Sequence, residues 1–381
     1  MKMKLRGELF LKWGLILLTI GWVGVYLVKN RDSFEQGYNS TYWQHRYLKS
    51  QWVQGYQSSL PMGDGELYAY AGWRQILGDD PTLVNPEHPP LGKYLLGLSI
   101  KIFANPRSIA PILGFFLLFL LYKVSKHFLK KSWLAWLVVF FFSSQSLFRE
   151  ELIASMLDLP LALLVMLSFY FFLKSEKKVF YFLPALFSLG LVAATKMYLL
   201  GFGLIGLLCV VMLGVAVWQH EKKYLFFFLF LPFALLAYLS SYFVYFAKGH
   251  GWLDFKYLLF WIRHFARVRV EGYPRGEILR ILMLGRWRTW WDSGAVISVR
   301  QWSFIWPLGA IASGLILAEG LREKNFALLF LGIWPFIFLS VFFWGVPYPR
   351  YLLPILPFFY LNFVYQLKAW GERSKWGLKK R

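Results

Sequence analysis

The sequence is poor in cysteine and in charged residues. Cys209 is the only cysteine among 381 residues, which excludes an intrachain disulfide and a metal site built from several cysteines. Only 16% of the residues are charged and 58% are hydrophobic, whereas an ordinary globular domain carries about 25% charged residues. Because a soluble core cannot hide this much apolar surface, the sequence predicts an all-α polytopic membrane protein.

Acidic residues are also scarce. There are 20 Asp and Glu against 42 Lys and Arg, which gives a formal net charge of +22. In a soluble protein this excess would suggest binding to nucleic acid. Here much of it lies in short basic links beside apolar runs, which is the positive-inside pattern of membrane proteins. The basic links are therefore assigned to the cytoplasmic side, and nucleic acid is not an expected partner.

About ten apolar runs are long enough to cross a bilayer. No small-x-small cleavage site follows the first run, so it is interpreted as a retained span rather than a signal peptide. The sequence contains no low-complexity tract and no separate soluble domain, and residues 1–381 are interpreted as a single transmembrane domain. The predicted spans are 10–28, 108–124, 133–148, 158–173, 179–195, 197–218, 224–246, 303–319, 326–344 and 351–367.

The side on which each loop lies follows from the basic links. If these links and both termini are cytoplasmic, the stretch 92–103 must not cross, and its short length and internal lysines favour a helix on the outer surface. Two large loops, about 29–107 and 247–302, then lie outside, and a short tail, 368–381, lies inside. Their many Trp and Tyr residues predict packed helical loops. We expect a multi-pass plasma-membrane protein whose polar chemistry is on the outer face.

Two carboxylates stand together in the first outer loop. Ionisable residues at the membrane are costly and are functional candidates for that reason. Asp64 and Glu66 flank Gly65 at the start of an aromatic-rich segment. Either one can accept a proton from an attacking hydroxyl, and either can cap a helix or stabilise its first turn. Both are therefore predicted catalytic residues that can also have a structural role.

A second group of polar residues surrounds a pair of prolines. Pro89 and Pro90 fix an extended entry into the surface helix, so that Glu87 and His88 are held near the interface. Glu87 is predicted to bind substrate or a metal, His88 to donate to a phosphate or a sugar hydroxyl, and Lys93 to bind substrate. The alternative for His88 is a satisfied interfacial histidine. Zinc is not expected, because no second histidine stands at metal-ligand spacing.

Further charges lie where apolar runs begin or meet. Asp158 opens a span and is a predicted catalytic residue, and helix capping is the alternative. It needs a partner, for which Arg149, itself a predicted substrate-binding residue, is the nearest strong candidate. Lys196 lies between two spans, and Arg350 lies at the outer mouth of the last one. Both are predicted to bind an anionic group such as a phosphate, although Lys196 can also snorkel to the interface. If a divalent cation is bound, its predicted ligands are Asp64, Glu87 and Asp158.

The second outer loop carries the remaining positive charge. Its arginines alternate with tryptophans, a combination that suits a phosphate-linked sugar, and the alternative is contact with anionic lipid head groups. The run 201–206 matches the dinucleotide pattern G-x-G-x-x-G, but it lies inside an apolar span with no preceding strand, so close helix packing explains it better. The arginines are Arg263, Arg267, Arg269, Arg275, Arg280, Arg286, Arg288 and Arg300.

The order of these motifs resembles the GT-C glycosyltransferases, in particular the protein O-mannosyltransferase and aminoarabinose (lipid A) transferase group. His88 to Lys93 match the His-Pro-Pro-Leu-Gly-Lys motif in full, and Glu87 fits the first position of the Glu-Lys-Pro version. Asp64 matches the Asp of an Asp-Glu pair, but Gly65 stands where the family has Glu, so Asp64 and Glu66 remain alternatives for the base. The other matches are Arg149, Leu157-Asp158, Lys196 and Arg350 to Pro354.

The resemblance implies a GT-C-type bundle and a specific chemistry. A sugar would pass from a polyprenyl-phosphate donor to a hydroxyl on a protein, a glycolipid or a cell-wall polymer at the outer face, with Asp64 as general base. Lys196, His88 and loop arginines would stabilise the lipid-phosphate leaving group, and Asp158 would orient Arg149, a metal or the acceptor. The alternatives are a transporter or lipid flippase, and a membrane scaffold without enzymatic activity.

Overall fold

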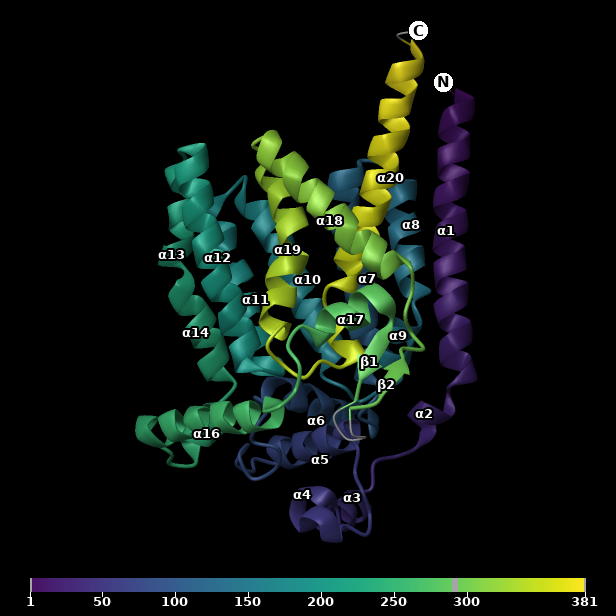
Figure 1. The fold of residues 1–381 in the computed structure, drawn as a ribbon. Coiled ribbons are helices and arrows are strands. Elements are labelled where there is room, and N and C mark those ends of the chain that lie inside the picture. Colours follow the sequence, from purple (N-terminus) through teal and green to yellow (C-terminus); the bar gives the residue numbers. More distant parts are fainter. Residues whose placement is uncertain (1, 290–293, 380–381) are drawn as a thin grey trace.

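The computed structural model describes residues 2–289 and 294–379, and most of these residues are helical. Long apolar helices run side by side as one bundle, and shorter elements cover one end of it (Figure 1). The bundle contains α1 (Lys2–Lys29), α7 (Ile109–Leu129), α8 (Ser132–Ser143), α10 (Asp158–Ser175), α11 (Phe182–Thr195), α12 (Tyr198–Gln219), α13 (Phe226–Leu229), α14 (Leu231–Ser240), α18 (Ile305–Arg322), α19 (Phe326–Phe342) and α20 (Leu356–Lys379).

The bundle confirms the predicted class, an all-α membrane protein. Six helices in the described part of the chain are long and apolar enough to cross a bilayer, and three shorter apolar helices accompany them. These nine segments coincide with the first nine predicted spans. The tenth predicted span corresponds to a 3₁₀ turn, η4 (Pro349–Leu352), and the first half of α20. Other 3₁₀ turns are η1 (Gly55–Gln57), η2 (Val179–Tyr181) and η3 (Lys222–Leu225).

Most covering elements come from the two predicted outer loops and the short links, but the helices at 146–151 and 243–247 begin inside the predicted spans 133–148 and 224–246. In Figure 1, α5, α6 and α16 lie across one end of the bundle, whereas the start of α1 and the end of α20 lie at the other. The predicted surface helix at 92–103 is α6, and it does not cross. The covering helices are α2 (Asp32–Glu35), α3 (Ser40–Leu48), α4 (Gln51–Gln54), α5 (Asp64–Ile76), α6 (Leu91–Phe103), α9 (Ser146–Glu151), α15 (Phe243–Ala247), α16 (Trp252–Val270) and α17 (Glu277–Leu284).

The second outer loop also contains a β-hairpin, which the sequence analysis did not predict. Strands β1 (Arg286–Arg288) and β2 (Val296–Ser298) pair antiparallel, with Arg286 opposite Ser298. The β-branched residues Val296 and Ile297 favour an extended backbone. The second outer loop is therefore partly helical and partly a two-stranded ribbon.

Small residues allow the bundle helices to approach closely. A Cβ atom on Gly190 of α11 would lie 2.1 Å from the carbonyl oxygen of Ala234 in α14. A Cβ on Gly201 of α12 would lie 2.4 Å from the Cβ of Ala193 in α11. Such contacts are typical of helix packing in membranes. At Gly201 they bear out the packing interpretation of the G-x-G-x-x-G run, whereas Gly206 has no such neighbour within 4 Å.

Candidate functional site

Four charged side chains from distant parts of the sequence meet at the covered end of the bundle. Lys196 Nζ donates to Asp158 Oδ1 at 2.6 Å. Arg350 lies between the two carboxylates, with its Nη2 atom 2.5 Å from Asp64 Oδ2 and its Nε atom 3.5 Å from Asp158 Oδ2. The charges therefore alternate along one chain of contacts, which we call the charge relay: Asp64, Arg350, Asp158 and Lys196.

Burial differs sharply along the charge relay. The side chains of Asp158 and Lys196 are 1% and 2% exposed, whereas Arg350 is 18% and Asp64 is 33% exposed. Removing two charges from water is costly, so a pair this deep must be closely matched. Asp64 is thus the carboxylate that an incoming molecule can reach, and Asp158 is the one that holds the two cations in place.

Helix ends and aromatic rings position these side chains. Asp158 is the first residue of α10, where the helix dipole favours a negative charge. The Lys196 ammonium lies 4.2 Å from the centre of the Tyr351 ring, and the Arg350 guanidinium lies 4.6 Å from that of Tyr348. Cations over ring faces are stabilised by the ring quadrupole. Tyr348 and Tyr351 therefore orient both cations of the relay, a role that the sequence analysis missed.

Close packing of α5 on α6 connects Asp64 to the second predicted group. A Cβ atom on Gly72 of α5 would lie 2.1 Å from the carbonyl oxygen of Lys93, and one on Gly97 of α6 would lie 2.1 Å from that of Gly72. Only glycines allow two backbones to come this near. The crossing therefore fixes the start of α5, and with it Asp64, against the segment that carries His88.

His88 joins the relay through the backbone. Its Nδ1 atom lies 2.7 Å from the carbonyl oxygen of Lys196. A carbonyl only accepts, so Nδ1 must carry the proton. Burial and the nearby ammonium groups of Lys196 and Lys93 lower the pKa of His88 to about 3. A neutral ring with its proton on Nδ1 leaves Nε2 as an acceptor, so the predicted donation to a phosphate is corrected: Nε2 suits a hydroxyl donor instead.

Lys93 and Glu87 are used inside the protein. The fully buried Lys93 Nζ donates to the carbonyl oxygens of Asn85 and His88, each at 2.7 Å. Burial lowers the pKa of Lys93 to about 7 and raises that of Glu87. Glu87 Oε1 accepts from Asn85 Nδ2 at 2.6 Å. The predicted substrate contacts of Lys93 and Glu87 do not fit this geometry, because both side chains hold the loop that presents His88.

Glu66 lies outside the relay. Its Oε2 atom accepts from the Gly63 backbone N–H at 3.0 Å and pairs with Arg46 at 3.0 Å, which is the capping alternative. Gly65, between Asp64 and Glu66 in the sequence, packs closely against Ser155: a Cβ atom on Gly65 would lie 2.9 Å from Ser155 Oγ. The missing family glutamate at position 65 therefore has a steric reason, and Asp64 is the carboxylate of this pair that faces Arg350.

The predicted pairing of Arg149 with Asp158 is wrong. The Arg149 guanidinium lies 5.2 Å from the ring centres of both Trp22 and Tyr26 in α1, whereas Asp158 pairs with Lys196 and Arg350. Arg149 therefore attaches α9 to the first span.

The predicted ligands of a divalent cation do not come together. Asp64 and Asp158 both face Arg350, and Glu87 is bound to Asn85. Over residues 2–289 and 294–379 no cluster of three metal-ligating side chains is present. A guanidinium thus occupies the position between the two carboxylates that a bound cation would take, and the residues do not fit the proposed metal site.

A cavity of about 420 Å³ opens beside the relay. It lies between α9, the β1–β2 hairpin and η4, and Arg350 forms part of its wall. The sequence analysis assigned roles to Arg350 and to the arginines and tryptophans of the second outer loop, which include Arg300 and Trp287 of this wall, but none to Glu151. The pocket contains Leu147, Glu150, Glu151, Ala154, Met156, Trp287, Ile297, Ser298, Val299, Arg300, Gln301, Tyr348, Pro349 and Arg350.

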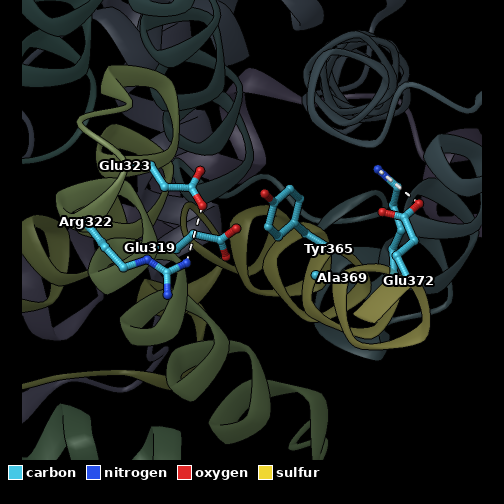
Figure 2. Close-up of a pocket in the computed structure, with 7 residues that line it drawn as sticks. Glu319, Arg322, Glu323, Tyr365, Ala369 and Glu372 are labelled. Carbon is cyan, nitrogen blue, oxygen red and sulfur yellow. Dashed lines mark hydrogen bonds and ion pairs between the residues drawn. The ribbon is translucent and has the colours of Figure 1, made fainter. Parts of the chain in front are cut away.

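A larger cavity, of about 610 Å³, lies far from the relay, where α18 ends and α20 passes it. Figure 2 shows Glu319, Arg322 and Glu323 on one side of it and Tyr365 and Glu372 on the other. No predicted site residue lines this cavity, and two of its ion pairs join residues close in sequence, Lys368 with Glu372 and Arg322 with Glu323. It is not connected to the chemistry of the relay.

Comparisons with known proteins support the fold. No family model and no curated protein matches the chain. The crystal structure of ArnT from Cupriavidus metallidurans in the apo state matches with a TM-score of 0.50 and 15% identity, over 92% of this chain and 61% of that one. The same protein bound to undecaprenyl phosphate gives 0.48 and 17%, over 93% and 62%. The chain spans about three fifths of ArnT, and over that length its membrane fold is similar to that of ArnT.

Proposed function

We propose that the protein is an integral membrane glycosyltransferase that moves a sugar from a polyprenyl-phosphate donor to a hydroxyl acceptor. The observation that carries the proposal is the charge relay, in which a reachable carboxylate and a partly exposed guanidinium stand side by side. A base and an anion-binding cation are what this transfer needs. The ArnT fold supports the same reaction class, since ArnT has been crystallised with undecaprenyl phosphate.

The proposed reaction is one displacement at the anomeric carbon. The acceptor oxygen attacks that carbon while its proton passes to a carboxylate oxygen of Asp64. The bond from the anomeric carbon to the phosphate oxygen breaks, and its electron pair leaves with the lipid phosphate. Arg350 stabilises the negative charge that accumulates on this oxygen. The leaving group is already a stable anion, so the reaction needs a cation rather than a strong acid.

Arg350 must change partners during this reaction. In the free protein its guanidinium is paired with Asp64, so that carboxylate is not free to accept the acceptor proton. A donor phosphate offers the guanidinium a bidentate partner, and Asp64 is then released to accept the acceptor proton. Asp158 keeps Arg350 in reach throughout, because the Asp158 carboxylate is buried with Lys196. Donor binding thus activates the base.

We assign the relay to the outer face of the plasma membrane. The basic links at the opposite end of the bundle satisfy the positive-inside rule when that end is cytoplasmic. The transporter or flippase alternative receives less support, because it calls for charged groups near the middle of broken helices. Asp158, by contrast, is the first residue of its span.

A transfer assay tests the proposal. Purified protein in detergent is supplied with a radiolabelled undecaprenyl-phosphate sugar and a membrane extract as acceptor source. Loss of a general base lowers rates by about 100-fold or more, so Asp64→Asn is expected to lower kcat by that factor. Asp32→Asn, an equal change at an exposed residue of α2, is the control. Equal turnover by Asp64→Asn and wild type would remove the catalytic assignment.

A further inference from the structure

Glu151 is a buried carboxyl group that the proposed reaction does not use. It is the last residue of α9 and only 5% exposed. Its Oε2 atom has no hydrogen-bond partner within the described residues. A buried acceptor without a partner is costly, and side chains of this kind are often completed by a ligand. Glu151 lines the cavity beside the relay.

The cavity has the size and composition of a small-molecule site. Its volume of about 420 Å³ lies within the range of about 300–1,000 Å³ that ligand pockets occupy. Trp287 contributes an aromatic face, which suits the apolar face of a sugar ring. Glu150 is not available as a second carboxylate of the same kind, because its Oε2 atom accepts from Gln301 Nε2 at 2.8 Å.

The surroundings keep Glu151 protonated at neutral pH. Burial, followed by the negative charge of Asp158, raises its pKa to about 8, against the opposing effects of Arg350 and Lys196 and with a further contribution from Glu150. A protonated carboxyl group donates one hydrogen bond. It also adds no negative charge beside an anionic ligand. Arg300, on the hairpin side of the cavity, adds a positive charge.

We propose that this cavity holds the sugar ring of the lipid-phosphate donor, and that Glu151 donates a hydrogen bond to one of its hydroxyl groups. The inference rests on the proposed function. The donor is favoured over the acceptor because Arg350 lines the cavity and is the proposed phosphate ligand. The sugar is bonded to that phosphate, so its ring must lie next to the phosphate that Arg350 binds.

The pH dependence of donor KM tests the role of Glu151. In wild type, KM is expected to rise about tenfold from pH 7 to pH 9, the effect of losing one hydrogen bond, because Glu151 ionises and repels the phosphate. Glu151→Gln keeps a neutral hydrogen-bond donor, and its KM is expected not to change with pH. This result would distinguish the ionisation of Glu151 from that of Lys93, whose pKa is about 7. Glu151→Leu is expected to have a raised KM at both values. Glu323→Gln, at the other cavity, is the matched control.

The same measurements separate the two proposals. If wild type transfers sugar and Glu151→Leu has the wild-type KM and pH profile, the cavity assignment is overturned while the proposed function stands. If wild type transfers no sugar, the proposed function fails and the donor assignment falls with it. A raised KM with unchanged kcat supports the cavity assignment, whereas a loss of kcat alone overturns it.

A binding experiment tests whether the cavity takes a phosphate-linked sugar or an acceptor. Saturation-transfer NMR is recorded on the detergent-solubilised protein with mannose 1-phosphate and with methyl α-mannopyranoside. Stronger transfer to mannose 1-phosphate at pH 7, weakened at pH 9 in wild type but not in Glu151→Gln, supports a donor site. Equal transfer to the methyl glycoside with no pH dependence assigns the cavity to an acceptor and overturns the proposal.

Discussion

At the scale of single residues, the charge relay is asymmetric. Asp158 has two cationic partners, Lys196 and Arg350, whereas Lys196 has one carboxylate partner in the described residues. Uncompensated buried charge, rather than a lost contact, dominates the cost of breaking such a pair. Replacing Asp158 should therefore cost a different amount of folding stability from replacing Lys196.

This asymmetry predicts unequal effects on stability. Asp158→Asn leaves Lys196 and Arg350 close together without the carboxylate between them, and is expected to cost about 3–5 kcal/mol. Lys196→Met leaves Asp158 paired with Arg350, so its cost is expected to be smaller. Thermal unfolding of the detergent-solubilised variants measures both. A melting temperature lower for Lys196→Met than for Asp158→Asn would contradict the prediction.

At the scale of elements, the crossing of α5 and α6 determines where Asp64 lies. Gly72 and Gly97 are the contact points, and each leaves no room for a Cβ atom against the other helix. The structure thus depends on glycine at these positions for a steric reason, and not for a left-handed backbone. The two helices lie across the bundle end (Figure 1), so a shift between them moves Asp64 away from Arg350.

Gly97→Ala is expected to separate the two helices. Overpacking costs about 1–3 kcal/mol, and the displaced Asp64 should lower transfer activity as well. Gly206→Ala in α12 is the control, because nothing lies within 4 Å of its added methyl group. Thermal unfolding and the transfer assay are measured side by side. If Gly97→Ala unfolds at the same temperature as Gly206→Ala, the steric account of the crossing is wrong.

At the scale of the whole molecule, the charges divide the bundle into two ends. Asp64 of the relay begins α5, which lies across one end of the bundle, whereas the start of α1 and the end of α20 lie at the other end (Figure 1). The basic link between α7 and α8 lies with the start of α1, because Lys131 pairs with Glu8. An arrangement of this kind fixes one orientation in the membrane, since short basic links are retained in the cytoplasm. The assignment of the relay to the outside is a prediction that follows from this division.

Cysteine labelling tests the orientation. In a Cys209→Ser background, Tyr56→Cys in the first outer loop and Lys177→Cys in a basic link each provide a single thiol. Tyr56 is 96% exposed and Lys177 is exposed. A membrane-impermeant maleimide added to intact cells is expected to label Tyr56→Cys and not Lys177→Cys, and permeabilised cells should label both. The reverse pattern in intact cells would place the relay in the cytoplasm.

The sequence by itself determined the spans, because a segment that crosses a bilayer must be apolar over its whole length. It also identified Asp64, Asp158, Lys196 and Arg350 as functional candidates, because charged residues at the membrane are energetically costly. Only the tertiary structure decided their partners. Pairing depends on which helix ends meet, so Asp158 contacts Lys196 and Arg350 rather than the nearby Arg149, and Lys93 is buried rather than open to substrate. Glu151 stands beside Arg149 in the sequence but received no role there, since its burial arises from segments far along the chain.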